Sequence, residues 1–99
     1  MRIITFLLEA EEEMNSSALY YNQQSSGLGL DFLEEIEKSL QLIKKSPERW
    51  PYYEENIQKY NTRRFSFSLY YVFEKDLDKI IIIAVAHQKR KPGYWKQRI

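Results

Sequence analysis

The C-terminal segment combines positive charge with aromatic rings. Residues 88–99 contain five cations and no acid: Lys89, Arg90, Lys91, Lys96 and Arg98. Tyr94 and Trp95 lie among these cations. Because aromatic rings can stack on nucleobases and cations can pair with phosphates, the segment is expected to bind an anionic polymer or an acidic protein. Alternatively, the cations belong to a terminus that is merely solvated, and the rings of Tyr94 and Trp95 cap the core.

His87 is the only histidine, and it ends the apolar run before that segment. Histidine can exchange a proton near neutral pH, which makes His87 a candidate acid or base. The same position suits a side chain that only hydrogen-bonds to backbone at the rim of a sheet.

Arg63 and Arg64 are adjacent, so in a strand they point to opposite faces and only one can face a common ligand. The other is expected to pair with an acidic helix.

The sequence contains no cofactor or metal motif. It has no glycine-rich phosphate loop, no paired metal-ligand spacing, no serine nucleophile elbow and no dinucleotide fingerprint. A lone histidine cannot anchor a metal, and a chain without cysteine has no thiolate site. We therefore expect no cofactor and no metal.

The apolar start is too short and acidic for a signal peptide, and no segment approaches the roughly 20 apolar residues of a membrane span. A cytoplasmic protein without membrane contact is expected.

The formal net charge of +1 conceals a strong asymmetry along the chain. Residues 1–56 hold 5 Lys and Arg against 11 Asp and Glu, whereas residues 57–99 hold 10 against 3. The 99 residues, of which 43% are hydrophobic, are suited to one globular domain with one core, residues 1–99. We expect a basic flank where the last strands converge, on a side of the domain away from an acidic helical part.

The first half of the chain predicts a strand followed by two helices. Residues 2–8 are β-branched and aromatic, which favours a strand that could be buried on both faces. Helices are expected over residues 9–24 and from Leu28 to about Ser46, where Pro47 ends the second. The link between them is short, so they should form an antiparallel hairpin. Their apolar stripes are Ala10, Met14, Ala18 and Tyr21, then Leu28, Phe32, Ile36, Leu40 and Ile43.

The second half predicts a loop and three strands. Residues 46–56 hold two prolines and three aromatic residues, which indicate an ordered loop. Strands are expected over residues 57–64, 67–74 and 79–87, the first suited to a sheet edge and the last to the middle of a sheet covered on both sides. The order strand, helix, helix, strand, strand, strand predicts an α+β fold with the hairpin on one face of a mostly antiparallel four-stranded sheet. The other face is expected to stay available.

Eight short segments, taken in order, resemble one protein family. They are Ala10–Glu13, Tyr20–Tyr21, Gly27–Gly29, Phe32–Ile36, Ser46–Glu48, Arg63–Phe65, Ala84–Gln88 and Pro92–Trp95. Each is weak alone, but together they span nearly the whole chain and resemble the RelE/ParE superfamily of toxins from type II toxin–antitoxin systems. The resemblance implies a RelE/ParE-like fold and a toxin held inactive by a cognate antitoxin, whose helix or strand wraps it.

The resemblance leaves three activities open. RelE-like members cut messenger RNA on the ribosome, whereas ParE-like members inhibit DNA gyrase by binding it. The third possibility is a non-toxic homologue that only binds its antitoxin and, through the antitoxin, operator DNA. The fold does not choose among them, because function depends on the site rather than on the scaffold.

For the ribonuclease, the resemblance implies a catalytic set of His87, Arg90, Arg64 and Tyr94. Cleavage by the 2′-hydroxyl of RNA needs a base, an acid and cations that stabilise the phosphate as its charge grows. The expected target-binding residues are Arg63, Lys89, Lys91, Trp95, Lys96 and Arg98. The glutamate of some relatives has no counterpart here, because Glu48, Glu54 and Glu55 fit no motif. The ending Pro92–Trp95 is shared instead with ParE-like and uncharacterised members.

Overall fold

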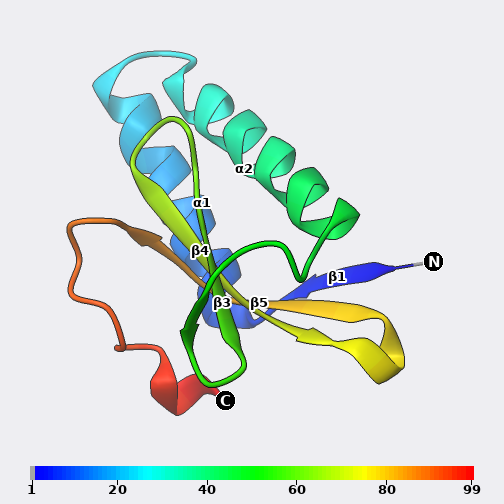
Figure 1. Ribbon diagram of the computed structural model, residues 1–99. Coiled ribbons are helices and arrows are strands. Elements are labelled where there is room, and N and C mark those ends of the chain that lie inside the picture. Colours follow the sequence, from blue (N-terminus) through cyan, green and yellow to red (C-terminus); the bar gives the residue numbers. More distant parts are fainter. Residues whose placement is uncertain (1) are drawn as a thin grey trace.

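The computed structural model describes residues 2–99, in which a helical hairpin packs on one mixed sheet (Figure 1). The elements are β1 (Ile3–Phe6), α1 (Leu8–Gln24), α2 (Leu28–Lys45), β2 (Tyr52–Glu54), β3 (Ile57–Asn61), β4 (Phe67–Glu74) and β5 (Lys79–His87). Short 3-10 turns, η1 (Lys75–Leu77) and η2 (Lys96–Arg98), follow β4 and precede the C-terminus. The predicted α+β class is confirmed, and so are the two helices of the hairpin.

Two glycines allow the helices to turn and to pack closely. Gly27 adopts a left-handed φ of 89°, and its N–H donates to Asn22 Oδ1 at 2.9 Å. A Cβ at Gly29 would lie 2.4 Å from the carbonyl oxygen of Ala18, so only glycine fits at this crossing of α1 and α2. The helix faces that contact the sheet are largely those that the apolar spacing predicts. Their buried members are Ala10, Ala18, Phe32, Ile36, Leu40 and Ile43.

The sheet has the strand order β1-β5-β4-β3-β2. β1 pairs with β5 in parallel, and the other neighbours are antiparallel. β5 is therefore an interior strand, and its residues Ile82–Ala86 are all buried, as its apolar sequence predicts. β1 lies at an edge instead of being buried on both faces, and its first residue, Ile3, is exposed. Within residues 2–99, no helix has the length and apolar character needed to span a bilayer.

The sheet has five strands, not the four that the sequence predicts. The additional strand, β2, lies in the segment 46–56 that was expected to be a loop. Tyr52 of β2 pairs with Gln58 of β3, and the Lys59 N–H donates to the Pro51 carbonyl at 2.9 Å. A strand of three residues is too short to show the alternation by which strands are recognised. β2 takes the edge position that was expected for β3, and Ile57, Gln58 and Tyr60 of β3 are buried.

The face of the sheet opposite the helices is covered, which overturns the expectation that it stays available. The C-terminal segment folds back over this face and places Trp95, which is 0% exposed, against Tyr70, with 3.8 Å between ring centroids. The buried side chains on this face form a second core cluster, separate from the one under the helices: Ile57, Tyr70, Ile83, Ala84, Ala86 and Trp95. A bulge between Tyr70 and Tyr71 lets two successive residues of β5, Ile83 and Ala84, join it. The core-capping alternative is therefore confirmed for Trp95.

Candidate functional site: a groove with an internal carboxylate

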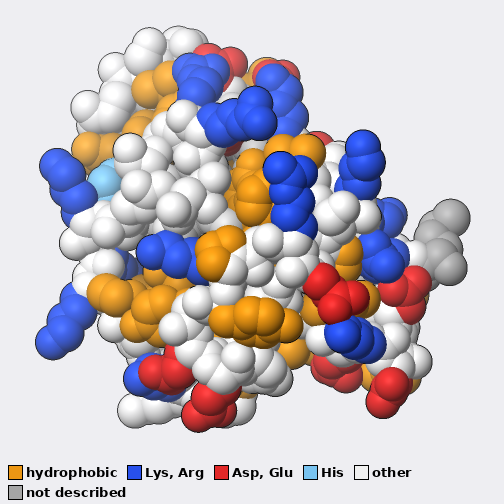
Figure 2. Space-filling model, viewed as in Figure 1, with side chains coloured by type: hydrophobic (Ala, Val, Ile, Leu, Met, Phe, Trp, Pro, Cys, Tyr) orange, Lys and Arg blue, Asp and Glu red, His pale blue; other side chains and the backbone are white. Residues whose placement is uncertain are grey.

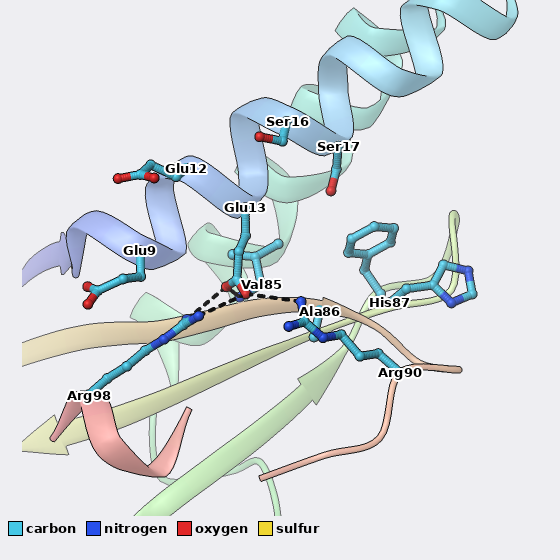
Figure 3. Close-up of a pocket in the computed structure, with 11 residues that line it drawn as sticks. Glu9, Glu12, Glu13, Ser16, Ser17, Val85, Ala86, His87, Arg90 and Arg98 are labelled. Carbon is cyan, nitrogen blue, oxygen red and sulfur yellow. Dashed lines mark hydrogen bonds and ion pairs between the residues drawn. The ribbon is translucent and has the colours of Figure 1, made fainter. Parts of the chain in front are cut away.

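A groove of about 490 Å³ runs between the first half of α1 and the end of β5 (Figure 3). Helix α1 contributes three glutamates and two serines, and β5 contributes its last residues. His87, Arg90 and Arg98, three of the sequence-predicted site residues, line this groove. The remaining lining residues are Glu9, Glu12, Glu13, Ser16, Ser17, Phe67, Val85 and Ala86.

The Glu13 carboxylate is the centre of a hydrogen-bond network in this groove. Arg98 donates from Nη1 to Oε1 at 2.9 Å and from Nη2 to Oε2 at 3.1 Å. The Tyr94 phenol donates to Oε2 at 2.6 Å, and the Val85 N–H donates to Oε1 at 3.0 Å. Arg90 Nη1 lies 3.6 Å from Oε2 and completes an ion pair. One carboxylate therefore engages two cations, a phenol and a backbone amide.

These contacts fix the protonation of the network. Burial favours the neutral form of Glu13, but the hydrogen bonds from Arg98, Tyr94 and the Val85 amide outweigh burial, so its pKa is lower than the ordinary 4.5. Burial, followed by the hydrogen bond to Glu13, raises the pKa of the Tyr94 phenol far above its ordinary value. The bond to Glu13 raises the pKa of Arg98. Near neutral pH, Glu13 is ionised and the Tyr94 proton points at it.

Arg90 sits at the rim of the network. Its guanidinium carbon lies 3.5 Å from the centroid of the Tyr94 ring, a cation–π contact, while 55% of its side chain stays exposed. Arg98 is held more tightly, because it also donates to the carbonyl of Ile83 at 3.0 Å. The two arginines therefore differ. Arg98 is fixed by hydrogen bonds to Glu13 and Ile83, whereas the Arg90 side chain largely faces solvent.

His87 takes the position expected at the rim of the sheet. Its Nδ1 accepts a hydrogen bond from the Lys89 N–H at 3.1 Å, and its ring packs edge-on against Phe67. This is the backbone contact of the structural alternative. Within residues 2–99, no hydrogen bond engages Nε2, and the ring lies at the far end of the groove from Arg98 (Figure 3).

Arg63 and Arg64 lie in the turn between β3 and β4, since β3 ends at Asn61 and not at residue 64. The expectation that they point to opposite faces of a strand is therefore wrong, and both residues are exposed. Their backbone N–H groups, rather than their side chains, donate to Glu35 Oε2 at 2.8 and 3.1 Å. The Gln88 N–H donates to the Ser66 carbonyl at 2.7 Å, which holds this turn beside the end of β5.

The expected basic flank, lying away from the acidic helices, is wrong for most of the C-terminal cations. Arg90 and Arg98 pair with Glu13 of α1, and Lys96 pairs with Glu54 at 3.0 Å. Lys89 and Lys91 are exposed, and within residues 2–99 neither forms an ion pair. Figure 2 shows Lys and Arg side chains spread across a whole face, with acids between some of them. The acidic first half of the chain and the basic C-terminal segment therefore pair with each other in the folded protein, because the segment folds back toward α1.

Sequence reasoning missed Glu13, which looked like one of four similar glutamates in the first turns of α1. Its position relative to the apolar stripe carries the distinguishing signal. Glu13 lies three residues after the buried Ala10, which places it at the margin of the buried face. Glu48 and Glu54 lie elsewhere and pair with Lys75 and Lys96. Within residues 2–99, no group of three or more His, Cys, Asp or Glu side chains could hold a metal.

Comparison with solved structures shows the fold. The chain is similar to the chromosomal ParDE system from P. aeruginosa, with a TM-score of 0.74 and 12% identity over 88% of this chain and 95% of that one. It is also similar to the isolated E. coli RelE toxin, with a TM-score of 0.67 and 18% identity over 99% and 96%. The toxin–antitoxin complex RelBE of E. coli gives the same score and identity over 91% and 100%. These structures confirm the RelE/ParE-like fold.

Comparison with family models gives a more specific result. The model described as the ParE toxin of the type II toxin–antitoxin system, parDE, matches residues 4–92. A comparison with curated proteins gives no match. Because the family model covers nearly the whole chain, including Glu13 and Arg90 of the groove but not Tyr94 or Arg98, the chain belongs to the ParE toxin family of type II toxin–antitoxin systems.

Proposed function

We propose that this toxin arrests growth by binding DNA gyrase and not by cutting messenger RNA. Glu13 carries the proposal. Arg90, Tyr94 and Arg98 are the cations and the proton donor that a ribonuclease would turn toward RNA, and all three engage the Glu13 carboxylate. A phosphate that accepted hydrogen bonds from Tyr94 and Arg98 would have to displace that carboxylate. The ParE family match favours the same branch, for which the resemblance implies gyrase inhibition.

The exposed cations at one end of the sheet supply a target-binding surface. Lys89 and Lys91 follow β5, and the turn that holds Arg63 and Arg64 lies beside them through the Gln88–Ser66 hydrogen bond. Long, exposed cations of this kind raise the rate of encounter with an anionic or acidic partner. We infer that this end of the molecule approaches a gyrase complex carrying DNA.

Two assays on the purified toxin test the target. Supercoiling by gyrase should be blocked, and messenger RNA in a ribosome-containing translation reaction should stay intact. Lys89→Glu combined with Lys91→Glu should weaken the inhibition, whereas Lys45→Glu, at the exposed end of α2, should not. Cut message with normal supercoiling would refute the gyrase proposal.

A ribonuclease is the second candidate, because His87 leaves Nε2 without a hydrogen bond within residues 2–99 and shares the groove with the solvent-facing Arg90. In that case His87→Ala and Arg90→Ala should each slow cleavage by orders of magnitude. The assays above separate the two activities. A toxin that causes no growth arrest on induced expression would instead support the non-toxic homologue.

The cognate antitoxin has a candidate docking surface on the helical hairpin. Leu19 and Leu30 are exposed large apolar side chains beside a shallow groove that Gly29 and Leu33 also line. The similarity to the E. coli RelBE complex supports an antitoxin as the partner. Coexpression of the cognate antitoxin should rescue growth. Leu30→Lys should reduce the rescue, while Gln41→Lys, exposed on the same helix, should leave it intact.

A further inference from the structure

Glu13 fills a site whose other groups are built to hold an anion. Two guanidinium N–H groups of Arg98, the phenol of Tyr94 and the amide of Val85 donate at distances between 2.6 and 3.1 Å. Arg90 adds a second positive charge at 3.6 Å. Converging N–H and O–H donors with two guanidinium groups are the arrangement that binds phosphate oxygens as readily as a carboxylate.

The site is enclosed on one side and open on the other. The side chains of Glu13 and Arg98 are 15% and 16% exposed, so water screens their interaction only weakly. The carboxylate also forms part of the wall of the groove, between Arg98 and the end of β5 (Figure 3). A ligand in the groove can therefore reach the same donors if the carboxylate is absent.

We propose that Glu13 is a specificity-determining residue that occupies this anion site and thereby excludes phosphate from the groove. Without the Glu13 carboxylate, the site takes phosphate oxyanions, either free or in single-stranded RNA. Because the proposed function needs a toxin that leaves RNA uncut, the exclusion deepens that function and rests on it.

Loss of the carboxylate makes phosphate binding favourable for two reasons. The Val85 amide, the Tyr94 phenol and the Arg98 guanidinium are left without their acceptor, and enclosed donors without acceptors destabilise the fold. An incoming phosphate restores those hydrogen bonds. Removal of Glu13 also lowers the negative charge of a wall that still carries Glu9 and Glu12.

Inorganic phosphate is the direct probe. Glu13→Ala should bind phosphate about tenfold more tightly than the wild-type chain, a change that one regained charge-assisted hydrogen bond would supply. Binding should shift the amide resonance of Val85 and raise the melting temperature of the variant above its value in chloride of equal ionic strength. Glu12→Ala is the matched control, because Glu12 lines the same groove on the same helix and loses the same charge without contacting the donors.

Two further variants keep the test decisive. Glu13→Ser shortens the side chain but keeps it polar, so it vacates the site and should also gain phosphate binding if Glu13→Ala does not fold. Arg98→Gln, added to either variant, should abolish the gain, which locates the site. The exclusion is refuted if a folded Glu13 variant binds phosphate no better than Glu12→Ala, or if the wild-type chain binds it equally well.

Single-stranded RNA and gyrase then separate the two proposals. A short RNA oligonucleotide should bind the Glu13 variant more tightly than the wild-type chain, and Arg98→Gln should reverse the effect. If phosphate binding appears as expected but the wild-type toxin leaves supercoiling unaffected, the gyrase target is wrong and the anion site stands. If supercoiling is blocked but no folded Glu13 variant gains phosphate binding, the gyrase target stands and the anion site is wrong.

Discussion

Arg98 donates two hydrogen bonds to Glu13, although 85 residues separate them in the chain. This pair joins the C-terminal segment to α1 across the end of β5. Between β5 and Arg98, the chain places Trp95 in the second cluster and Tyr94 against the same carboxylate. The tail is therefore a folded part of the domain, and three of its cations, Arg90, Lys96 and Arg98, are paired with acids of the same chain.

Arg98→Gln should destabilise the protein by about 1–3 kcal/mol, because Glu13 loses a bidentate partner in a weakly hydrated site; fully buried pairs lose about 3–5 kcal/mol when one partner is removed. The carbonyl of Ile83 also loses its donor. Urea unfolding followed by circular dichroism measures the change. Lys96→Gln removes an exposed pair with Glu54 and should change stability little. Equal losses in the two variants would mean that Arg98 contributes only as a surface charge.

Glu13 should make stability fall with acid. Its pKa is lower in the folded chain than the ordinary 4.5, so ionised Glu13 stabilises the fold above that ordinary value. This contribution is lost as the pH falls from about the unfolded pKa through the lower folded pKa. Unfolding free energies measured from neutral pH down to acid should therefore decline less steeply for Glu13→Gln than for the wild-type chain. Parallel curves would exclude Glu13 as a source of the acid sensitivity.

The elements of the fold could be predicted because most of them are encoded locally. Apolar spacing identified α1 and α2, and the continuous apolar run of β5 identified an interior strand. β2 could not be found in this way, because its three residues have no period and gain their place only by pairing with β3. The register bulge beside Tyr71 depends on the same tertiary context.

The candidate site was only partly predictable, for the same physical reason. His87, Arg90 and Arg98 could be named from residue type and position, and they do line one groove. For Glu13 the sequence holds only a weak signal, its place beside the buried Ala10, because its importance comes from partners more than 70 residues away. The charge asymmetry of the sequence suggested separated surfaces, but attraction between the two halves brings their charges together at Glu13.

Ile36→Ala tests the register of α2. Ile36 is 1% exposed and faces the core between the helices and the sheet. Its truncation should lower the free energy of unfolding by about 2–5 kcal/mol, because apolar burial is lost and a cavity is left behind. Leu30→Ala, on the exposed face of the same helix, is the matched control and should cost much less. Urea melts give both values. A loss below about 1 kcal/mol at Ile36 would contradict its central position.

Gly29→Ala sets helix propensity against packing. Alanine favours a helix interior by about 1 kcal/mol over glycine. The new Cβ, however, would lie 2.4 Å from the Ala18 carbonyl oxygen, which is backbone and cannot rotate away. Overpacking of this kind costs about 1–3 kcal/mol, so the variant should be less stable overall. A thermal melt that shows a higher midpoint for Gly29→Ala would mean that α1 and α2 can move apart without loss.

Trp95→Phe tests whether the C-terminal segment is held by ring volume or by a polar contact. Within residues 2–99 the buried Nε1 of Trp95 has no hydrogen-bond partner, so phenylalanine removes no hydrogen bond and leaves a smaller ring against Tyr70. The loss should be about 1–2 kcal/mol, against about 3–5 kcal/mol for Trp95→Ala. Tyr52→Ala, on the exposed edge strand β2, should have a small effect. Urea unfolding followed by circular dichroism orders the three variants, and equal losses for phenylalanine and alanine would show that the indole nitrogen, and not the ring volume, holds the segment in place.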